Sequence, residues 1–341
     1  MQAVQQVKSN PLESDELSLA MSILVCPACD AGVELKDSGV LCRDCGQTYS
    51  RNSSNGVIYF VEEESYAESF GLQWKTFSRE QLDNDRLHDS ERRFRQETGF
   101  FPEHIAGKTV LDAGCGMGRF LDVVSWDGAA LAVGVDLSSA VDAAAANLSD
   151  RDNALIVKGD IFRLPFRRES FDAVFSIGVL HHTPSTEQGF RALVPLVKPG
   201  GEIAISVYAA TMKPGVGWAI NMFRRRFFRV FTRRLPKRLM VWWSLYCVPV
   251  LWVIDKIPLV RWIRYLFPAV IYANYPPRWS VLDTFDTYAT ELESRHRPKE
   301  VFRWFREAGL INVDLLDSED GWVSVRGRAP AHWSLDYRTT R

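Results

Sequence analysis

The sequence predicts an α/β fold built on a mainly parallel sheet, with two additions. Across residues 107–211, short apolar strand patterns alternate with helical stretches, which is typical of βαβ units. The same alternation resumes over residues 298–328, after a break at residues 212–282. We therefore expect one α/β domain with a helical insertion after its fifth strand. Two C-x-x-C pairs near the start of the chain predict a second, small unit that depends on a metal.

The composition is that of an ordinary globular protein. The 341 residues carry a net charge of −1 and are 46% hydrophobic, enough for a sizeable core. The first twenty residues lack a basic region followed by an apolar run, so we expect no signal peptide. Without secretion, disulfides are disfavoured. We expect a cytoplasmic protein, with peripheral contact at the inner face of the membrane as an open alternative.

A glycine-rich turn follows the first expected strand of the α/β domain. Gly114, Gly116 and Gly118 form a G-x-G-x-G pattern, preceded by Asp112, between the strand TVLDAG and the helical run RFLDVV. Glycines at such a turn let the backbone approach a ligand closely. The spacing differs from the G-x-G-x-x-G pattern of dinucleotide folds. An acid beside exposed backbone N–H groups suits the amino-acid end of S-adenosylmethionine better than a pyrophosphate.

Two further acids end the next two expected strands. Asp136 closes LAVGVD, the position that binds ribose hydroxyls in related folds, and Asp160 closes ALIVKGD. Ile161 follows and is apolar enough to flank an adenine. A purely structural set of turns with incidental acids is the alternative, which the three correctly placed strand ends disfavour.

At this point the chain resembles a known family. VLDAGCGMGRF, the aspartate of VGVDLS, GDIFRLPF, FDAVFSIGVLHHTP and LVPLVKPGGEIAISV resemble the successive motifs of class I methyltransferases, above all the methyltransferase type 11 group with its ubiquinone/menaquinone-type enzymes. The resemblance implies a Rossmann-like sheet and S-adenosyl-L-methionine as cofactor. The cofactor-binding residues that it implies are Asp112, Gly114, Gly116, Gly118, Asp136, Leu137, Asp160 and Ile161.

The four paired cysteines predict a structural zinc ribbon. Cys26 and Cys29 are separated by twelve residues from Cys42 and Cys45, and four thiolates on two hairpins suit a tetrahedral Zn²⁺. Disulfides and a degenerate ribbon without metal remain the alternatives. The segment resembles the zinc ribbons of methyltransferase activator proteins and of some ribosomal RNA guanine methyltransferases.

The insertion is basic and aromatic. Between Trp218 and Leu235, apolar residues at spacings of three and four form one stripe, and six arginines occupy most of the remaining positions. The apolar run at residues 239–254 is too short to span a membrane and contains Pro249. We expect a helical cap over the ligand end of the sheet. Its arginines are either solvated or in contact with an anionic membrane or a lipid-like substrate.

Candidate catalytic and substrate-binding residues follow from their places in the chain. His181 and His182 follow the fourth strand, where an imidazole could act as a base or merely shape the pocket. Aromatic and polar groups before the first strand and after the insertion are candidate substrate contacts, with ordinary packing as the alternative. These contacts are Tyr66, Phe70, Trp74, Tyr288 and His296, and Asp286 is a further candidate.

These observations divide the chain into seven segments. They are a disordered lead at 1–21, the zinc ribbon at 22–61, a helical segment covering the cofactor at 62–106, the core at 107–211, the basic aromatic cap at 212–282, the C-terminal part of the core at 283–328 and a tail at 329–341.

The function we expect is methyl transfer from S-adenosylmethionine to a small-molecule or lipid-like acceptor. A ribosomal or transfer RNA methyltransferase is the first alternative, because arginines can bind phosphates. Nucleic acid is less favoured as a partner because the ribbon region is acidic, and contact with an anionic membrane stays open. A non-catalytic partner protein with a methyltransferase fold is the second alternative.

Overall fold

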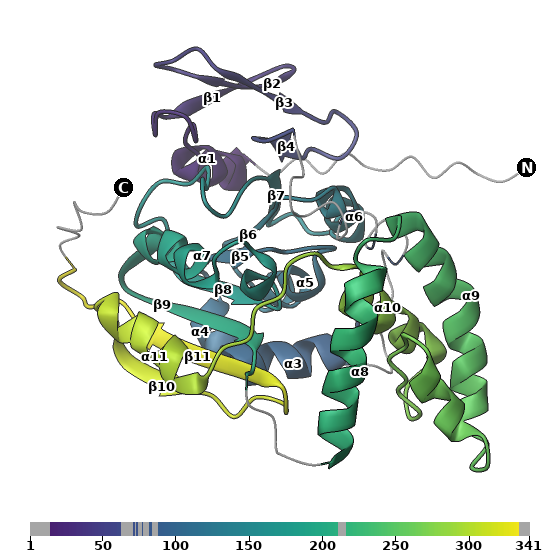
Figure 1. Cartoon of the computed structure of the whole chain (residues 1–341). Helices are drawn as coiled ribbons and strands as arrows, with labels where there is room; N and C mark the ends of the chain where they lie inside the picture. The colour runs from purple at the N-terminus through teal and green to yellow at the C-terminus, as the bar shows by residue number, and fades with distance from the viewer. Residues whose placement is uncertain are drawn as a thin grey trace, which may run out of the picture.

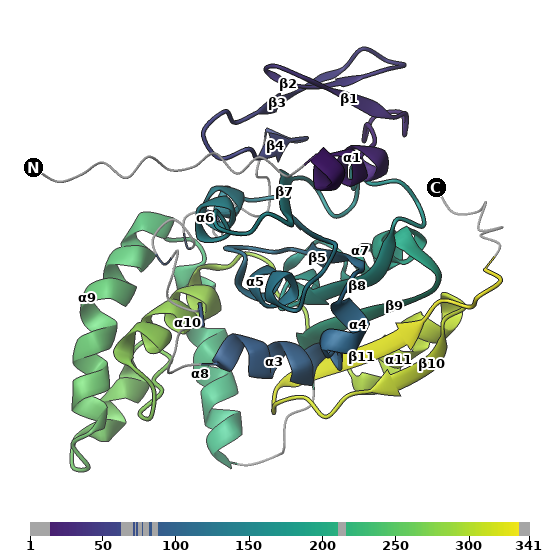
Figure 2. The same cartoon turned by 180° about the vertical axis from the view of Figure 1, so that it is seen from behind.

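The computed structural model describes residues 14–62, 71, 73, 77, 82–83, 88–210 and 216–333. A mixed sheet runs through the molecule, with helices on both faces, a small β unit at one edge and a helical insertion beside the ligand end (Figures 1 and 2).

The centre of the sheet is parallel, in the order β7-β6-β5-β8-β9. The chain lays down β5, β6 and β7 in one direction and then returns to place β8 on the other side of β5. The strand order therefore reverses between β5 and β8, and ligands bind at such a point in open α/β sheets. The strands are β5 (Thr109–Ala113), β6 (Leu131–Asp136), β7 (Ala154–Lys158), β8 (Phe171–Ile177) and β9 (Val197–Tyr208).

A final strand pair closes one side of the sheet. β11 (Trp322–Arg328) pairs antiparallel with β9, and β10 (Ile311–Leu315) forms the outer strand. The helix before this pair, α11 (Pro298–Glu307), begins at a proline and ends next to Gly309, as the sequence pattern predicts. The fold class expected from the sequence is confirmed.

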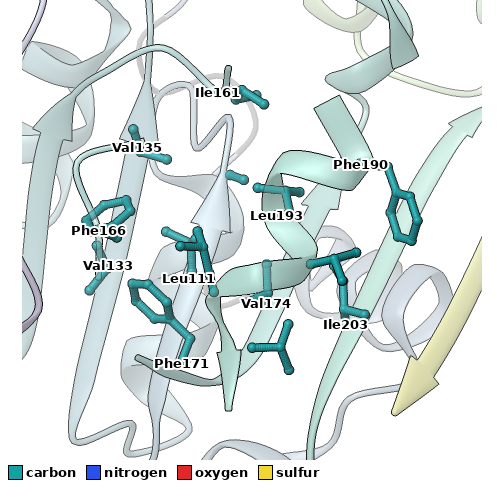
Figure 3. Packing of buried hydrophobic residues seen from close by; sticks show 14 of the residues in the cluster. Leu111, Val133, Val135, Ile161, Phe166, Phe171, Val174, Phe190, Leu193 and Ile203 are labelled. Atoms are coloured by element: carbon teal, nitrogen blue, oxygen red, sulfur yellow. The ribbon is translucent and has the colours of Figure 1, made fainter. Parts of the chain in front are cut away.

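Alternation along the buried strands divides the core between the two faces of the sheet. On one face, Leu111, Val133 and Ile203 pack with Phe190 and Leu193 of α7 (Thr186–Leu193) (Figure 3). The opposite face is covered by α3 (Asp89–Thr98), α4 (Pro102–Ile105), α5 (Arg119–Trp126) and α6 (Ala140–Asn147). Both layers hold the ends of the central strands rigidly in place.

The N-terminal β unit continues the main sheet. It consists of β1 (Val33–Lys36), β2 (Gly39–Cys42), β3 (Thr48–Arg51) and β4 (Ile58–Tyr59). β4 pairs parallel with β7, so the order at this edge is β1-β2-β3-β4-β7. The Tyr59 hydroxyl also donates to Asp142 of α6 at 2.5 Å. The ribbon therefore covers an edge strand of the parallel sheet.

The expected disordered lead at residues 1–21 is corrected in its last part. Residues 14–21 belong to α1 (Ser14–Ile23), whose Ala20 and Ile23 are buried in the core. The amide of Val25 then donates to the carbonyl of Pro165 at 3.0 Å. A short segment without strong periodicity becomes helical because it packs against the sheet, and this contact is invisible in the local sequence.

The insertion is helical, as expected, and its elements pack on one another. They are α8 (Val216–Thr232), α9 (Lys237–Asp255), the 3₁₀ segment η4 (Arg261–Leu266) and α10 (Pro277–Ala289). The expected boundary between residues 282 and 283 falls inside α10, because Leu282 and Phe285 of that helix both pack against the other helices of the insertion.

The orientation of α8 divides the six arginines into two groups, and only the exposed group, Arg226, Arg233 and Arg234, fits the expectation of solvent or membrane contact. Arg225 and Arg229 point inward and pair with Glu293 at 2.7 and 2.5 Å, while Arg224 donates to carbonyl oxygens of the segment 264–269. Phe223, in contrast, is 74% exposed. The apolar stripe thus faces outward, and half of the six arginines are neither solvated nor able to reach a membrane.

The carboxylate of Glu293 fixes the insertion onto the core. It also accepts a hydrogen bond from Arg295 at 3.1 Å. Burial alone would raise the pKa of Glu293, but the three guanidinium groups outweigh burial and lower the pKa below its ordinary value. Glu293 therefore stays ionised and neutralises arginines from two segments.

One helix in the described part of the chain, α9, is long and apolar enough to cross a membrane by length and composition alone. Only 22% of its most apolar stretch is buried. Buried core helices of soluble proteins can pass the same test, so this property by itself decides little.

We expect Glu293→Ala to lower the free energy of unfolding by about 3–5 kcal/mol, because it leaves buried guanidinium groups without their counter-charge. Glu291→Ala is the matched control: Glu291 contacts Lys237 at 3.3 Å and is 56% exposed, so its loss should cost less than about 1 kcal/mol. Urea unfolding followed by circular dichroism measures both. Equal effects of the two substitutions would contradict the role of Glu293.

Candidate cofactor and acceptor site

A cavity of about 530 Å³ opens where the parallel strands end. Its walls come from the turn after β5, the ends of β6, β8 and β9, the helices α3, α8 and α10, and the loop before β11. Ligand pockets of proteins commonly enclose 300–1,000 Å³. The cavity therefore has room for a nucleoside-sized cofactor together with the reacting group of an acceptor.

The glycine-rich turn forms the floor of this cavity. Gly114, Gly116 and Gly118 have φ angles of +91°, +52° and +86°, a region that other residues rarely adopt. A Cβ at position 114 would lie 2.4 Å from the side chain of Val179. Glycine is needed here both for the backbone conformation and for the space beside η2 (Leu180–His182).

Asp136 ties the turn to the next strand. One carboxylate oxygen accepts a hydrogen bond from the amide of Gly116 at 2.9 Å, and the other accepts from the amide and hydroxyl of Ser138 at 2.8 and 2.7 Å. The carboxylate therefore has a fixed position on the cavity wall, at the strand end where ribose hydroxyls bind in related folds.

Five of the eight expected cofactor residues line the cavity, namely Gly114, Gly116, Asp136, Leu137 and Ile161. The other three support it from behind. Gly118 begins α5, where a Cβ would approach Leu148 to 2.9 Å. Asp160 accepts a hydrogen bond from the amide of Phe162 at 3.0 Å and so shapes the turn that presents Ile161.

Asp112 is buried below the glycine turn. It is 1% exposed, and one of its carboxylate oxygens has no hydrogen-bond partner within the described residues. Burial, and secondly the charge of Asp136, raise the pKa of Asp112 well above its ordinary value. A cation bound beside this carboxyl group would oppose the effect of burial and stabilise its ionised form.

The two histidines have different environments. His182 lines the cavity, and its Nδ1 lies 2.8 Å from the carbonyl oxygen of Leu292, so this nitrogen carries the proton. His181 is fully buried against Tyr208, at 3.8 Å between ring centroids, and neither of its ring nitrogens has a hydrogen-bond partner in the described structure. Burial, then the neighbouring His182, lower the pKa of His181 well below its usual value. The expectation that His181 could act as the base is therefore wrong, because its ring does not reach the cavity.

The expected substrate contacts do not meet in the cavity. Tyr288 is buried among the insertion helices beside Phe228 and Met240. His296 hydrogen-bonds the hydroxyls of Thr186 and Ser294, both at 3.0 Å, and is part of the junction that returns the chain to the core. The expectation that Tyr288 and His296 contact the substrate is therefore wrong. Tyr66, Phe70 and Trp74 lie outside the described residues.

The far wall of the cavity is lined by residues that the sequence reasoning largely missed. Asp283 and Asp286 lie one turn apart on α10, and the Tyr208 hydroxyl donates to Asp286 at 3.1 Å. Burial raises the pKa of Asp283 to about 6, although a hydrogen bond from the Tyr272 hydroxyl opposes the shift. Asp286 alone was a candidate, and its spacing from Asp283 is the local signal that could have indicated both.

Aromatic and basic side chains complete this wall. Tyr272, Tyr275 and Trp279 follow one another, with ring centroids 6.1 and 5.4 Å apart. The guanidinium of Arg93, on α3, lies 4.4 Å above the ring of Trp322. Arg225 and Arg295 line the same cavity. The wall opposite the glycine turn is therefore suited to a flat, polar group.

The cysteines form a cluster away from the cavity. The sulfur atoms of Cys26, Cys29, Cys42 and Cys45 lie within 4.8 Å of one another. Cys26 is 3.7 Å from Cys45, Cys29 is 3.4 Å from Cys42, and the Tyr49 hydroxyl lies 3.0 Å from the Cys26 sulfur. Thiolates around a tetrahedral Zn²⁺ would be about 3.8 Å apart, given Zn–S bonds of about 2.3 Å. The cluster thus fits a four-thiolate metal site.

Residues 111–205 match the family model described as a methyltransferase domain. This segment includes the glycine turn, Asp136 and His182. The chain carries a class I methyltransferase domain. This domain type uses S-adenosylmethionine, and five of the residues that the family resemblance implies for that cofactor line the cavity.

Known relatives match the chain in part. A tRNA (carboxymethyluridine(34)-5-O)-methyltransferase of Arabidopsis thaliana is 36% identical over 129 residues, 36% of this chain and 30% of the relative. A tRNA U34 carboxymethyltransferase of Pseudoalteromonas translucida is 34% identical over 106 residues, 30% of this chain and 33% of the relative. The chain thus spans about a third of the length of these curated relatives.

A solved S-adenosylmethionine-dependent methyltransferase from Aquifex aeolicus overlaps 74% of this chain and 97% of its own, at 14% identity and a TM-score of 0.42. The overlap is loose. The assignment of the fold rests on the strand order and on the matched domain.

The relatives correct the expected acceptor and partner. A small-molecule or lipid-like acceptor, with nucleic acid as the less favoured partner, is wrong, since the relatives named above act on tRNA by their names. The first alternative, an RNA methyltransferase, fits better. The acidic ribbon was a misleading argument against RNA, because the ribbon does not line the cavity.

We expect Asp136→Ala to weaken binding of S-adenosylmethionine at least about 100-fold, since hydrogen bonds to a charged group contribute roughly 1.5–3 kcal/mol each. Isothermal titration calorimetry measures the change. Asp150→Ala is the control, because Asp150 is exposed and contacts only its neighbour Arg151 in the described structure. Unchanged affinity in a folded Asp136→Ala protein would refute the assignment.

Proposed function

We propose that the chain methylates a nucleoside within an RNA, with a transfer RNA as the favoured substrate. The observation that carries this proposal is the similarity to tRNA methyltransferases, 36% and 34% identical over 129 and 106 residues. The far wall of the cavity, which lies largely in the insertion, supports it by its chemistry.

The size of the cavity limits how an RNA could enter. A volume of about 530 Å³ admits the cofactor and one base, but no duplex. The target nucleotide must therefore be unpaired or turned out of its stack. Tyr272, Tyr275 and Trp279 offer aromatic faces for that base, and such stacking contributes about 1–3 kcal/mol per base.

The aromatic wall is held rigidly. The indole N–H of Trp252 donates to the carbonyls of Tyr272 and Tyr275 at 3.0 and 3.2 Å. The amide of Tyr272 donates to the Ser280 hydroxyl at 2.9 Å. Contacts from α9 and α10 thus fix the loop that carries two of the three rings, which lowers the entropic cost of binding a base.

Basic groups at the cavity suit the backbone of the same nucleotide. Arg93 stacks its guanidinium on the ring of Trp322, and its buried Nε has no hydrogen-bond partner among the described residues. Its guanidinium lies in the cavity wall, where a cation suits a phosphate of the same nucleotide. Arg119, in contrast, is paired with Asp89 at 3.0 Å and serves to hold α3.

Methyl transfer depends more on the orientation of the acceptor relative to the cofactor than on acid–base groups. S-adenosylmethionine supplies a methyl group on a sulfonium, and alignment of the acceptor can contribute about 7–11 kcal/mol. Where the acceptor must lose a proton, we propose His182 or the Asp286 carboxylate as the group that takes it, since both line the cavity. Asp286 would be oriented for this by the Tyr208 hydroxyl.

We further propose that the cysteine cluster holds one structural Zn²⁺. The support is its geometry: four sulfur atoms lie within 4.8 Å of one another on two hairpins. The metal would stabilise the ribbon, whose strands are only two to four residues long.

The RNA proposal predicts transfer of label from radioactive S-adenosylmethionine to tRNA by the purified chain. Trp279→Ala should lower kcat/KM for tRNA about 10-fold or more, because a stacking contact is lost, and change the cofactor Kd less than threefold. Trp262→Ala is the matched control, an exposed tryptophan of the same insertion outside the cavity. Absence of label in total cellular RNA, with cofactor binding intact, would overturn the proposal.

The zinc proposal predicts about one zinc per chain in protein purified without chelator, measured by elemental analysis. Cys42→Ser should remove the metal and lower Tm, because the ribbon pairs with β7, while cofactor affinity stays within a few-fold. Cys247→Ser in α9 should retain the zinc. A metal content near zero in the wild-type protein would contradict the proposal.

A further inference from the structure

The outer face of the insertion is apolar. Phe223, Phe227 and Phe231 stand four residues apart on α8 and are 74%, 51% and 57% exposed. Trp242 and Val253 of α9 and Leu259 before η4 are also exposed. Large apolar side chains gathered on neighbouring helices are typical of an interaction surface. We call the exposed apolar side chains of α8, α9 and the segment 257–267 the apolar face.

The charges around this face have one sign. Residues 216–282 contain twelve Lys and Arg but a single acid, Asp255. Asp255 pairs with Arg264 at 2.6 Å, and its side chain is 5% exposed. Arg226, Arg233, Arg234 and Arg238 are exposed. The partner must therefore combine an apolar region with negative charge.

We propose that the apolar face docks the protein onto the surface of an anionic phospholipid bilayer. Aliphatic and aromatic side chains enter the boundary between head groups and acyl chains, and the exposed arginines contact lipid phosphates. The lipid is a docking site and not the methyl acceptor, so the proposal is independent of the proposed function.

The surface fits two other partners less well. A second copy of this chain would bring two basic surfaces together without carboxylates to compensate them. An RNA would contact the arginines but would leave Val253, Leu259 and the other side chains of the apolar face without apolar contacts. An anionic bilayer satisfies both features at once.

The packing of α9 indicates docking rather than insertion. Met240, Ser244, Val248 and Leu251 lie on one buried side of α9, against the other insertion helices. The Trp243 indole donates to the carbonyl of Pro268 at 3.0 Å. A spanning α9 would lose this side and these bonds, whereas a helix lying at the interface keeps them.

The cavity and the apolar face occupy different sides of α8. Arg225 points to Glu293 and the cavity, whereas Phe223 and Phe227 point outward. None of the three α8 phenylalanines lines the cavity. Lipid can therefore cover the apolar face without changing the cavity wall.

The test is co-sedimentation with vesicles of 30% phosphatidylglycerol in phosphatidylcholine, at low salt. We expect the wild-type protein to pellet, and Phe223→Ser/Phe227→Ser/Phe231→Ser to weaken partitioning at least about 100-fold. Arg233→Glu/Arg234→Glu/Arg238→Glu should weaken it by about fivefold or more per residue, and only on anionic vesicles. Trp126→Ser, which changes an exposed tryptophan on α5, should pellet like the wild type. Cofactor affinity verifies that each variant is folded.

Other outcomes overturn the proposal. Wild-type protein that stays in the supernatant would refute membrane docking. A dimer by analytical ultracentrifugation that the triple serine variant loses, without lipid binding, would identify a second copy as the partner. Loss of tRNA binding in the same variant, without lipid binding, would identify RNA. Protein that resists carbonate extraction from the vesicles would show that α9 spans the bilayer.

Discussion

The site depends on the return of the chain past β5, which places β8 beside the first strand of the sheet. Parallel pairing of β5 with both β6 and β8 leaves the turns after these strands side by side, with no side chain from an intervening strand between them. The glycine turn, the carboxylate of Asp136 and the ring of His182 meet there for this reason alone. The helical layers on both faces make the strand ends rigid, so the cavity floor is preorganised.

The carboxylate of Glu293 helps to join the insertion to the segment that returns to the core. Glu293 accepts from two arginines of α8 and from Arg295, and so fixes a helix of the insertion to the segment that re-enters the sheet. The same packing sets Asp283, Asp286 and the three aromatic rings opposite the cofactor side. The core thus supplies the walls proposed to bind the cofactor, and the insertion, which lies outside the matched domain, supplies the wall proposed for the acceptor.

The outward orientation of the phenylalanines follows from this ion pairing. A helix with apolar residues on one side ordinarily buries that side, but α8 turns three half-buried arginines inward because acceptors lie beneath them: Glu293 and the carbonyls of the segments 264–269 and 287–290. The ribbon, in contrast, is attached through backbone pairing: its short strands extend the sheet at β7 and protect that edge from solvent. Both additions are thus integral parts of the domain.

The sequence by itself determined the features whose signal is local. Strand alternation predicted the α/β class, the G-x-G-x-G turn and Asp136 predicted the cofactor side of the cavity, and the C-x-x-C pairs predicted the cysteine cluster. Tertiary structure alone decided that His182 and not His181 reaches the cavity, that Tyr288 is buried elsewhere, and that Arg225 faces inward. The physical reason is the range of the interactions. A turn or a pair of cysteines is specified by residues a few positions apart, whereas the direction of a helix face depends on acceptors such as Glu293, 68 residues beyond Arg225.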